Sequence, residues 1–162
     1  MGKKSGSLTK VEQTSERELV VTRTFDAPVH IVFEAWTKPD LFSQWWAPKS
    51  IGVPLVLCDM DVRTGGGYTI GFGQDAASAM KFYGKYLEVI PNVRLVWTNE
   101  ESPDAAITTV TFEDKGDTTL LVLRERYPSK KALDEGRGSE DGLPEQFEQL
   151  DALLARLGAC RS

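Results

Sequence analysis

The middle of the chain alternates between apolar and polar residues in short runs, and this pattern constrains the fold most. Six runs have the β-branched and aromatic content of strands, and short stretches rich in Gly, Asp, Asn and Pro separate them. The six runs are residues 54–62, 67–72, 79–90, 93–99, 106–113 and 118–127. Strands that follow one another through such short connections predict an antiparallel meander.

One long amphipathic helix follows the predicted strands. Apolar residues recur along it at spacings of four, three, four and three, at Leu143, Phe147, Leu150, Leu154 and Leu157. Pro144 lies near its start and Gly158 just past its end. An antiparallel sheet must cover its apolar face, and this helix is the only long apolar element available. The sequence therefore predicts an α+β fold in which a curved sheet wraps around the C-terminal helix.

The N-terminal half adds a seventh strand and two short helices. Residues 18–25 have the composition of a strand, and Pro28 then stands at the predicted first position of a helix. A helical apolar stripe follows, made of Val29, Val32, Phe33 and Trp36. Residues 41–46 fit a second short helix that Pro48 stops. Nearer the C-terminus, Ser129 is expected to cap a brief helix that runs through Glu135.

Length and charge narrow the functional class. A chain of 162 residues fits one domain, predicted at 17–158 between a flexible N-terminal tail, 1–16, and a C-terminal tail, 159–162. A net charge of −5 provides no basic field for nucleic acid. No run approaches the roughly 18 apolar residues of a membrane span, and the first residues lack the apolar core of a secretory signal. We therefore expect a cytoplasmic protein with no nucleic-acid partner and no membrane span.

The few cysteine and histidine residues give no sign of a cofactor or metal. Cys58 and Cys160 lie far apart in the sequence, so we do not expect a structural disulfide. His30 is the only histidine, so a zinc-type cluster cannot form. It lies off the apolar stripe of its helix and is read as a surface residue. The sequence offers Cys58 no base that would form its thiolate, so we place it in the core.

Trp45 and Trp46 raise a packing problem because adjacent residues on a helix point about 100° apart. Both indoles therefore cannot fill one position in the core. If one packs under the sheet, the other can line a cavity or its mouth, where its N–H would anchor a polar group of a ligand. The alternative, that both pack against different neighbours at the edge of the sheet, stays open.

Polar residues near the middle of the chain have a structural interpretation beside a catalytic one. Asp59, Asp61 and Arg63 alternate along a strand and share one face, whereas Met60 lies on the opposite face. Paired carboxylates can perform acid and base chemistry, but an exposed salt-bridge ladder is favoured here. The glycines at 65–67 lack the Gly-Lys-Ser/Thr of a phosphate loop and are read as a hairpin turn or bulge. Glu88 and Arg94 are expected to pair across the turn at 90–92.

Three segments resemble a known family. TFDAPVHIVFEAWTKPDLFSQWWAP, DVRTGGGY and YGKYLEVIPNVRLVW, in this order, are similar to the bacterial homologues of the activator of heat-shock-protein-90 ATPase, in the START-like (SRPBCC) superfamily. The resemblance covers roughly residues 18–157 and implies a helix-grip fold with seven strands around the last helix. It also implies a hydrophobic cavity for small ligands or lipids. Leu143 stands where the family often has Trp after Gly, which implies a different entrance to that helix.

Together these observations predict a domain that binds a small hydrophobic or amphipathic ligand between the sheet and the last helix. The expected cavity lining is Trp36, Trp45, Trp46, Met60, Tyr86, Trp97, Phe147 and Leu150. A protein-interaction role, with a chaperone as partner, is the alternative from another class. An enzyme of the cyclase or hydrolase sort ranks third, because the sequence assigns no nucleophile and base. Dimerisation through a sheet edge is a further prediction.

Overall fold

Eight antiparallel strands form one sheet in the order β1-β2-β8-β7-β6-β5-β4-β3. The computed structural model describes residues 9–47, 49–75, 77–100, 105–136 and 143–161. The strands are β1 (Lys10–Ser15), β2 (Glu18–Phe25), β3 (Leu55–Met60), β4 (Gly67–Phe72), β5 (Met80–Ile90), β6 (Arg94–Trp97), β7 (Ile107–Asp114) and β8 (Thr119–Arg126). The helices are α1 (Val29–Thr37), α2 (Pro39–Phe42), α3 (Lys130–Gly136) and α4 (Leu143–Arg161), with a short 3-10 helix, η2, at Lys49–Ile51. The α+β fold predicted from the sequence is confirmed.

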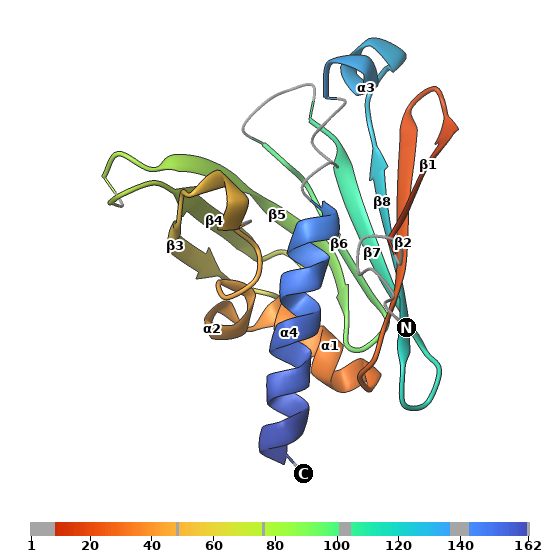
Figure 1. Ribbon diagram of the computed structural model, residues 1–162. Coiled ribbons are helices and arrows are strands. Elements are labelled where there is room, and N and C mark those ends of the chain that lie inside the picture. The colour runs from red at the N-terminus through yellow and green to blue at the C-terminus, as the bar shows by residue number, and fades with distance from the viewer. Residues whose placement is uncertain (1–8, 48, 76, 101–104, 137–142, 162) are drawn as a thin grey trace.

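The meander runs from β3 to β8 as the turn signals predict, and each predicted strand is present with its ends shifted by at most two residues. β5 is the longest strand and pairs with β4 through its first half and with β6 through its second. A bulge between Tyr86 and Glu88 separates the two halves. Bulges bend a strand and increase its twist. The β3–β4 end of the sheet accordingly turns away from the β1–β2 end (Figure 1).

The number of strands is a correction to the sequence analysis, which expected residues 1–16 to form a flexible tail. Residues 10–15 instead form β1, which pairs with β2 in register with Val11 opposite Val21. All six residues of β1 are exposed, so the strand carries no apolar alternation and is held by main-chain pairing. β1 and β3 are the two edges of the sheet among the described residues. Dimerisation through an edge stays a prediction.

The two short helices differ slightly from the predicted ones. Pro28 is the N-cap of α1 rather than its first residue. The second helix, expected over 41–46, ends at Phe42 and is followed by a turn that holds both tryptophans. The N–H groups of Trp45 and Trp46 both donate to the Phe42 carbonyl, at 3.2 Å each. Their own carbonyls accept hydrogen bonds from α4, so this segment does not continue a regular helical ladder.

α4 lies across the inner face of the sheet (Figure 1), and its apolar stripe is buried as predicted. Phe147 is fully buried and meets the ring of Phe25 on β2 edge-on, with centroids 5.4 Å apart. Gly158, expected just past the helix end, lies within the helix, which continues to Arg161. A glycine in a helix costs only about 1 kcal/mol relative to alanine, so it does not have to end the helix. α3 begins as predicted, because the Ala132 N–H donates to Ser129 Oγ at 3.0 Å.

A buried ion pair joins α4 to the sheet, and the sequence analysis did not identify it. Arg23 belongs to the inward row of β2 and is 1% exposed. Its guanidinium donates to the Asp151 carboxylate on α4 and to Thr9 Oγ1, the latter at 2.8 Å, and lies over the ring of Phe25. Burial raises the pKa of Asp151, while the positive charge of Arg23 acts in the opposite direction. The pair fixes the position of the helix over β2.

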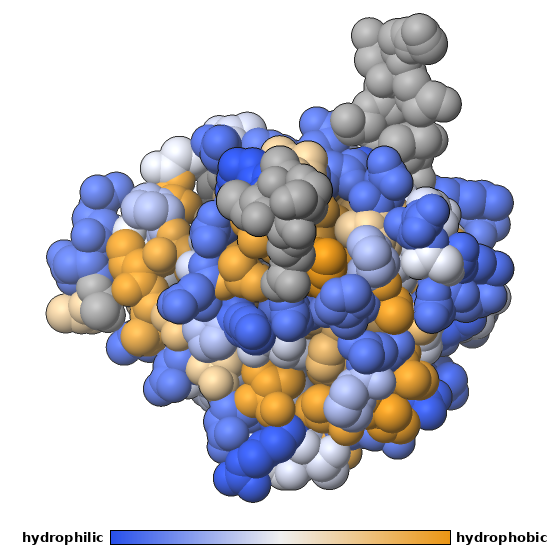
Figure 2. Space-filling view, turned by 90° about the horizontal axis from the view of Figure 1, so that it is seen from below, coloured by the Kyte–Doolittle hydropathy of each residue, from blue (hydrophilic) through white to orange (hydrophobic). Residues whose placement is uncertain are grey.

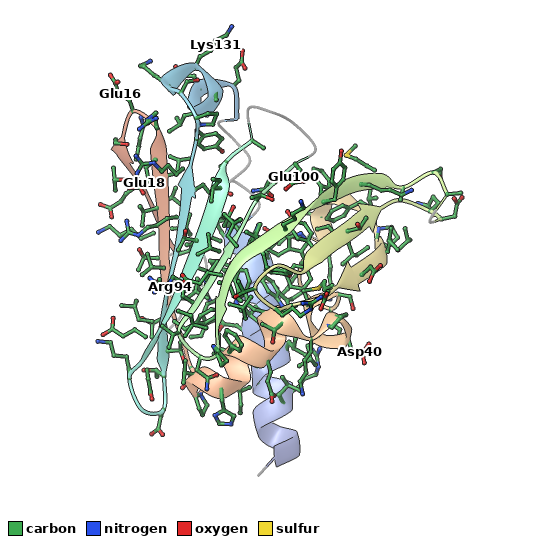
Figure 3. The ribbon with its side chains drawn as sticks, turned by 180° about the vertical axis from the view of Figure 1, so that it is seen from behind. Glu16, Glu18, Asp40, Arg94, Glu100 and Lys131 are labelled. Carbon is green, nitrogen blue, oxygen red and sulfur yellow. The ribbon has the colours of Figure 1, made fainter. Side chains whose placement is uncertain are left out.

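The outer face of the sheet carries charged side chains. Figure 3 looks onto this face from behind, with α4 on the far side of the sheet and Arg94 in view. Arg94 pairs with Glu88 at 2.9 Å, as predicted. The ladder expected for Asp59, Asp61 and Arg63 along one strand is found only in part, because β3 ends at Met60 and Arg63 pairs with Asp61 at 3.0 Å in the segment after it. Exposed pairs of this kind contribute little to stability. Among the described helices, none is both long and apolar enough to cross a membrane.

We expect Asp151→Asn to lower the free energy of unfolding by about 3 kcal/mol, because it leaves the Arg23 guanidinium buried without its counterion. This is the low end of the range for buried pairs, since the Asp151 side chain is 33% exposed. Urea denaturation followed by circular dichroism measures the change. Asp61→Asn, at an exposed pair, is the control and should change stability by less than about 1 kcal/mol. Equal losses in the two variants would contradict a special role for the buried pair.

Candidate ligand cavity

A cavity of about 500 Å³ lies between the inner face of the sheet and the first turn of α4. Strands β3 to β8 each contribute side chains to its wall, as do α1, α2, α3 and several connecting segments. Leu143 and Gln146 are the residues of α4 that face it. The later turns of α4 press directly on β2 and α1, through Phe147 among others. The open space is therefore confined to the start of the helix.

Aromatic rings form most of the apolar wall. The sheet contributes five of them, namely Tyr68 and Phe72 from β4, Phe82 and Tyr86 from β5, and Trp97 from β6. The helical side contributes Trp36 from α1, Phe42 from α2, and Trp46 from the turn that follows. The two groups meet where Trp36 and Trp97 approach with ring centroids 6.0 Å apart. Aromatic side chains thus line opposite sides of one space.

The two adjacent tryptophans have different surroundings. Trp45 is fully buried, and its indole N–H donates to the Ala35 carbonyl at 2.9 Å. Trp46 is partly exposed and stacks on Phe42, with centroids 4.8 Å apart and planes 25° from parallel. Trp45 therefore supports α1 from within the core, and Trp46 lines the cavity. This is the division of roles that the first interpretation of the sequence proposed.

Of the eight residues expected to line the cavity, five do so: Trp36, Trp46, Met60, Tyr86 and Trp97. The other three, Trp45, Phe147 and Leu150, are 0% exposed and belong to the packed core. Their positions correct the expectation that the middle of the last helix faces the cavity. The reason is that the sheet and α1 close directly onto the middle of α4, so that only its first turn stands clear of them.

Several cavity residues were missed by the sequence analysis. They include Tyr68, Ile70 and Phe72 on β4, Asn99 after β6, Thr108 on β7, Leu123 and Glu125 on β8, and Tyr127 directly after β8. The sequence did contain a signal for some of them, because residues two apart on a strand share one face. The cavity residues of β4, and those along and just after β8, follow that spacing. Periodicity alone could not decide which row faces inward, nor which part of the inner face stays uncovered.

One side of the cavity carries a chain of hydrogen bonds. The Tyr68 hydroxyl donates to the Thr98 carbonyl at 2.6 Å and to Asn99 Oδ1 at 3.1 Å. Asn99 Nδ2 in turn donates to the Ala106 carbonyl at 2.6 Å and to Thr108 Oγ1 at 3.2 Å. These contacts fix the amide in the cavity wall. The wall therefore has an apolar, aromatic side and a polar side.

Polar side chains of α4 hold the tryptophan segment in place. Gln146 Nε2 donates to the Trp46 carbonyl, and Gln149 Nε2 donates to the carbonyls of Trp45 and Ala47, at 2.9 Å each. One turn earlier, Glu145 accepts hydrogen bonds from the side chain and the main chain of Ser50. These bonds lower the pKa of Glu145. The first turns of α4 thus position Trp46 as well as covering the cavity.

The predicted glycine turn is confirmed, and it supports the cavity wall. Gly65 has φ +90°, and a Cβ at Gly66 would lie 2.1 Å from the Asp61 carbonyl oxygen, so both positions favour glycine. Gly65 N–H donates to the Tyr86 carbonyl at 2.9 Å, and Tyr86 N–H donates to the Gly66 carbonyl at 2.8 Å. The turn therefore fixes the backbone of Tyr86 at the bulge in β5. Burial raises the pKa of Tyr86, so its hydroxyl is neutral at physiological pH.

Chemistry-bearing residues outside this wall are few. Cys58 Sγ lies 3.8 Å from the Pro39 carbonyl oxygen and 3.5 Å from Met60 Sδ. His30 is exposed on α1. In the part of the chain that the structure describes, no three His, Cys, Asp or Glu side chains come together as a metal site would require. Cys160, considered above for a disulfide, lies outside the residues whose side chains are described.

Comparisons with known proteins agree with this architecture. A protein from Rhodobacter sphaeroides has a crystal structure that superposes with a TM-score of 0.82 at 21% identity, covering 92% of this chain and 99% of its own. One from Nitrosomonas europaea gives 0.77 at 24% identity, covering 91% and 99%. The protein Ms6760 from Mycobacterium smegmatis gives 0.79 at 23% identity, covering 92% and 98%. At such identities the likeness concerns the fold.

No curated protein matches the chain. A family model does match it, over residues 26–155, which is most of its length. The matched segment contains α1, the strands from β3 to β8 and the first turns of α4, and so includes all the elements that line the cavity. The resemblance noted in the sequence is thereby confirmed: the chain belongs to the family described as Activator of Hsp90 ATPase homolog 1-like protein.

Proposed function

We propose that the protein binds a small hydrophobic or amphipathic ligand in the cavity under the first turn of α4. The observation that carries this proposal is the volume of about 500 Å³ together with its aromatic lining. Sites for small molecules typically enclose roughly 300–1,000 Å³ and are mostly apolar, with a few placed polar groups. A space of this size lowers the stability of a domain core, so its presence supports a functional role.

The two sides of the cavity favour an amphipathic ligand. Trp36, Trp46, Met60, Tyr86 and Trp97 are proposed to contact its apolar part. The hydrogen-bonded wall of Asn99 and Thr108 would face its polar part. Trp45, Phe147 and Leu150 are assigned a supporting role, because they pack behind the wall without reaching the space.

A chaperone-associated role is the second candidate, and the family match motivates it. Exposed aromatic residues often anchor protein partners, but Trp46 is only partly exposed and stacks on Phe42. On the face seen in Figure 2, apolar residues lie in separate patches among hydrophilic ones. Scattered apolar residues are ordinary on a protein surface. An unchanged ATPase rate of the host's Hsp90-type chaperone on addition of this protein would contradict this role.

Catalysis is the third candidate, and the surroundings of Cys58 argue against a role for this residue as a nucleophile. Burial raises the pKa of the Cys58 thiol from 9.0 to about 11, and the negative charges of Asp40 and Asp59 add to this. The thiolate is the nucleophilic form of cysteine. The protonated thiol is half-buried against the core, in contact with Pro39 and Met60, and is not a nucleophile at neutral pH.

The binding proposal predicts that N-phenyl-1-naphthylamine, a neutral fluorescent probe, binds saturably and raises the melting temperature. At a free concentration of 100 Kd the native state gains about 2.7 kcal/mol, which raises Tm by roughly 5–10 °C. Ala132→Phe should weaken binding at least about tenfold, because it fills part of the cavity from α3. Ala152→Phe, at an exposed position of α4, is the matched control and should bind normally. Equal binding by both variants would contradict the site.

The thiol environment predicts slow alkylation of Cys58. In a Cys160→Ser variant, Cys58 is the remaining cysteine of the chain. Its iodoacetamide reaction at neutral pH should be at least about 100-fold slower in the native protein than after unfolding in guanidinium, because a pKa of about 11 instead of 9.0 lowers the thiolate fraction by that factor. Mass spectrometry of quenched samples measures both rates. Native labelling as fast as unfolded labelling would reopen the nucleophile hypothesis.

A further inference from the structure

The wall of the cavity is far richer in aromatic rings than the protein as a whole. Nine of its 21 residues are Trp, Tyr or Phe, against 9% in the complete sequence. Large aliphatic residues number four, namely Met60, Ile70, Leu123 and Leu143. From this wall we infer that the ligand is a planar aromatic molecule carrying a hydrogen-bonding group, rather than an alkyl chain. The inference rests on the proposed function and names the chemical class of its ligand.

The rings line the cavity, and some of them also belong to the hydrophobic core. Between β4 and β5, Phe72 meets Phe82 edge-on with centroids 5.8 Å apart, and between β5 and β6, Tyr86 meets Trp97 with centroids 6.4 Å apart and planes at 74°. On the helical side, Trp46 lies nearly parallel to Phe42. A molecule between these sides would therefore find both ring faces and ring edges. Aromatic pairs prefer offset-stacked and edge-to-face arrangements of this kind.

A preference for flat aromatic ligands differs from a general preference for hydrophobic ones. Apolar burial is non-directional and rises with the area removed from water, so by itself it favours the larger saturated molecule. A ring wall adds a directional term that only an aromatic ligand obtains. If the rings serve recognition, an aromatic ligand should bind better than a saturated one of the same skeleton, even though the saturated one is larger.

The polar side of the cavity indicates which polar group the ligand carries. Tyr68, Asn99 and Thr108 are already joined by hydrogen bonds, and their oxygen atoms retain lone pairs that can accept a further hydrogen bond. A hydroxyl group on an otherwise apolar ring system fits this wall, because it can donate to one of those oxygens. An aromatic alcohol is therefore the simplest probe of the inference.

Three probes with ten carbon atoms and one hydroxyl group each provide the test: 2-naphthol, decahydro-2-naphthol and 1-decanol. Isothermal titration calorimetry on the full chain measures Kd for each, and thermal unfolding supplies a second readout. We expect 2-naphthol to bind roughly tenfold more tightly than either saturated probe. Binding of a saturated probe at least as tight as that of 2-naphthol would overturn the aromatic inference while leaving the proposed binding function intact. Absence of binding by all three would overturn both.

A substitution in the cavity wall tests whether its rings cause the preference for 2-naphthol. Phe82→Leu replaces one ring of the wall by an aliphatic group, and we expect it to weaken 2-naphthol binding roughly 2- to 10-fold with little effect on 1-decanol. Tyr83→Leu, the next residue of β5 and exposed, is the matched control and should leave both affinities unchanged. Phe72→Leu repeats the test on β4 should Phe82→Leu prove unstable by melting temperature. Normal 2-naphthol affinity in the folded wall variants would overturn the inference.

Discussion

Burial of the apolar stripe of α4 against the inner face of the sheet is the constraint on which the rest of the structure depends. The β3–β4 end of the sheet turns away from the β1–β2 end (Figure 1), and α4 leaves part of the inner face uncovered. The middle of α4 is fixed over β2 by the packing of Phe147 on Phe25 and by the ion pair of Arg23 with Asp151. Because these contacts fix the position of the helix, its first turn lies over a part of the sheet that it does not touch. The cavity is the space between them.

The same helix also organises the opposite wall of the cavity. Its Gln146 and Gln149 bind the carbonyls of the segment that carries the two tryptophans, so the direction of Trp46 depends on where α4 lies. On the sheet side, the glycine turn at 65–66 holds the bulge of β5 and with it Tyr86. Main-chain and amide hydrogen bonds therefore position rings whose own contacts are apolar and would not fix their orientation alone. This arrangement gives a preformed space, which lowers the entropic cost of binding.

Family membership and fold fit either a ligand-binding or a chaperone-activator type of module, and the residues of the site favour the first. Eight of the cavity rings come from five separate elements and the turn after α2, and they face one space. Chemistry that would require a reactive thiol is disfavoured by the environment of Cys58. The distribution of aromatic and polar residues around the space, rather than the fold, narrows the class of molecule that would fit.

The sequence by itself determined the order of elements, the α+β class and the buried stripe of α4, because strand alternation and helical periodicity are local signals. It also predicted the pair of Glu88 with Arg94, which are close in the chain, but of the ladder expected for Asp59, Asp61 and Arg63 only the Asp61–Arg63 pair forms. It missed β1, which has no apolar face, and the pairing of Arg23 with Asp151 across 128 positions. Only the tertiary structure decided that Trp45, Phe147 and Leu150 fill the core while Tyr68 and Phe72 line the cavity. The reason is that periodicity says which residues share a face, whereas the angle at which α4 crosses the sheet decides which part of that face stays open.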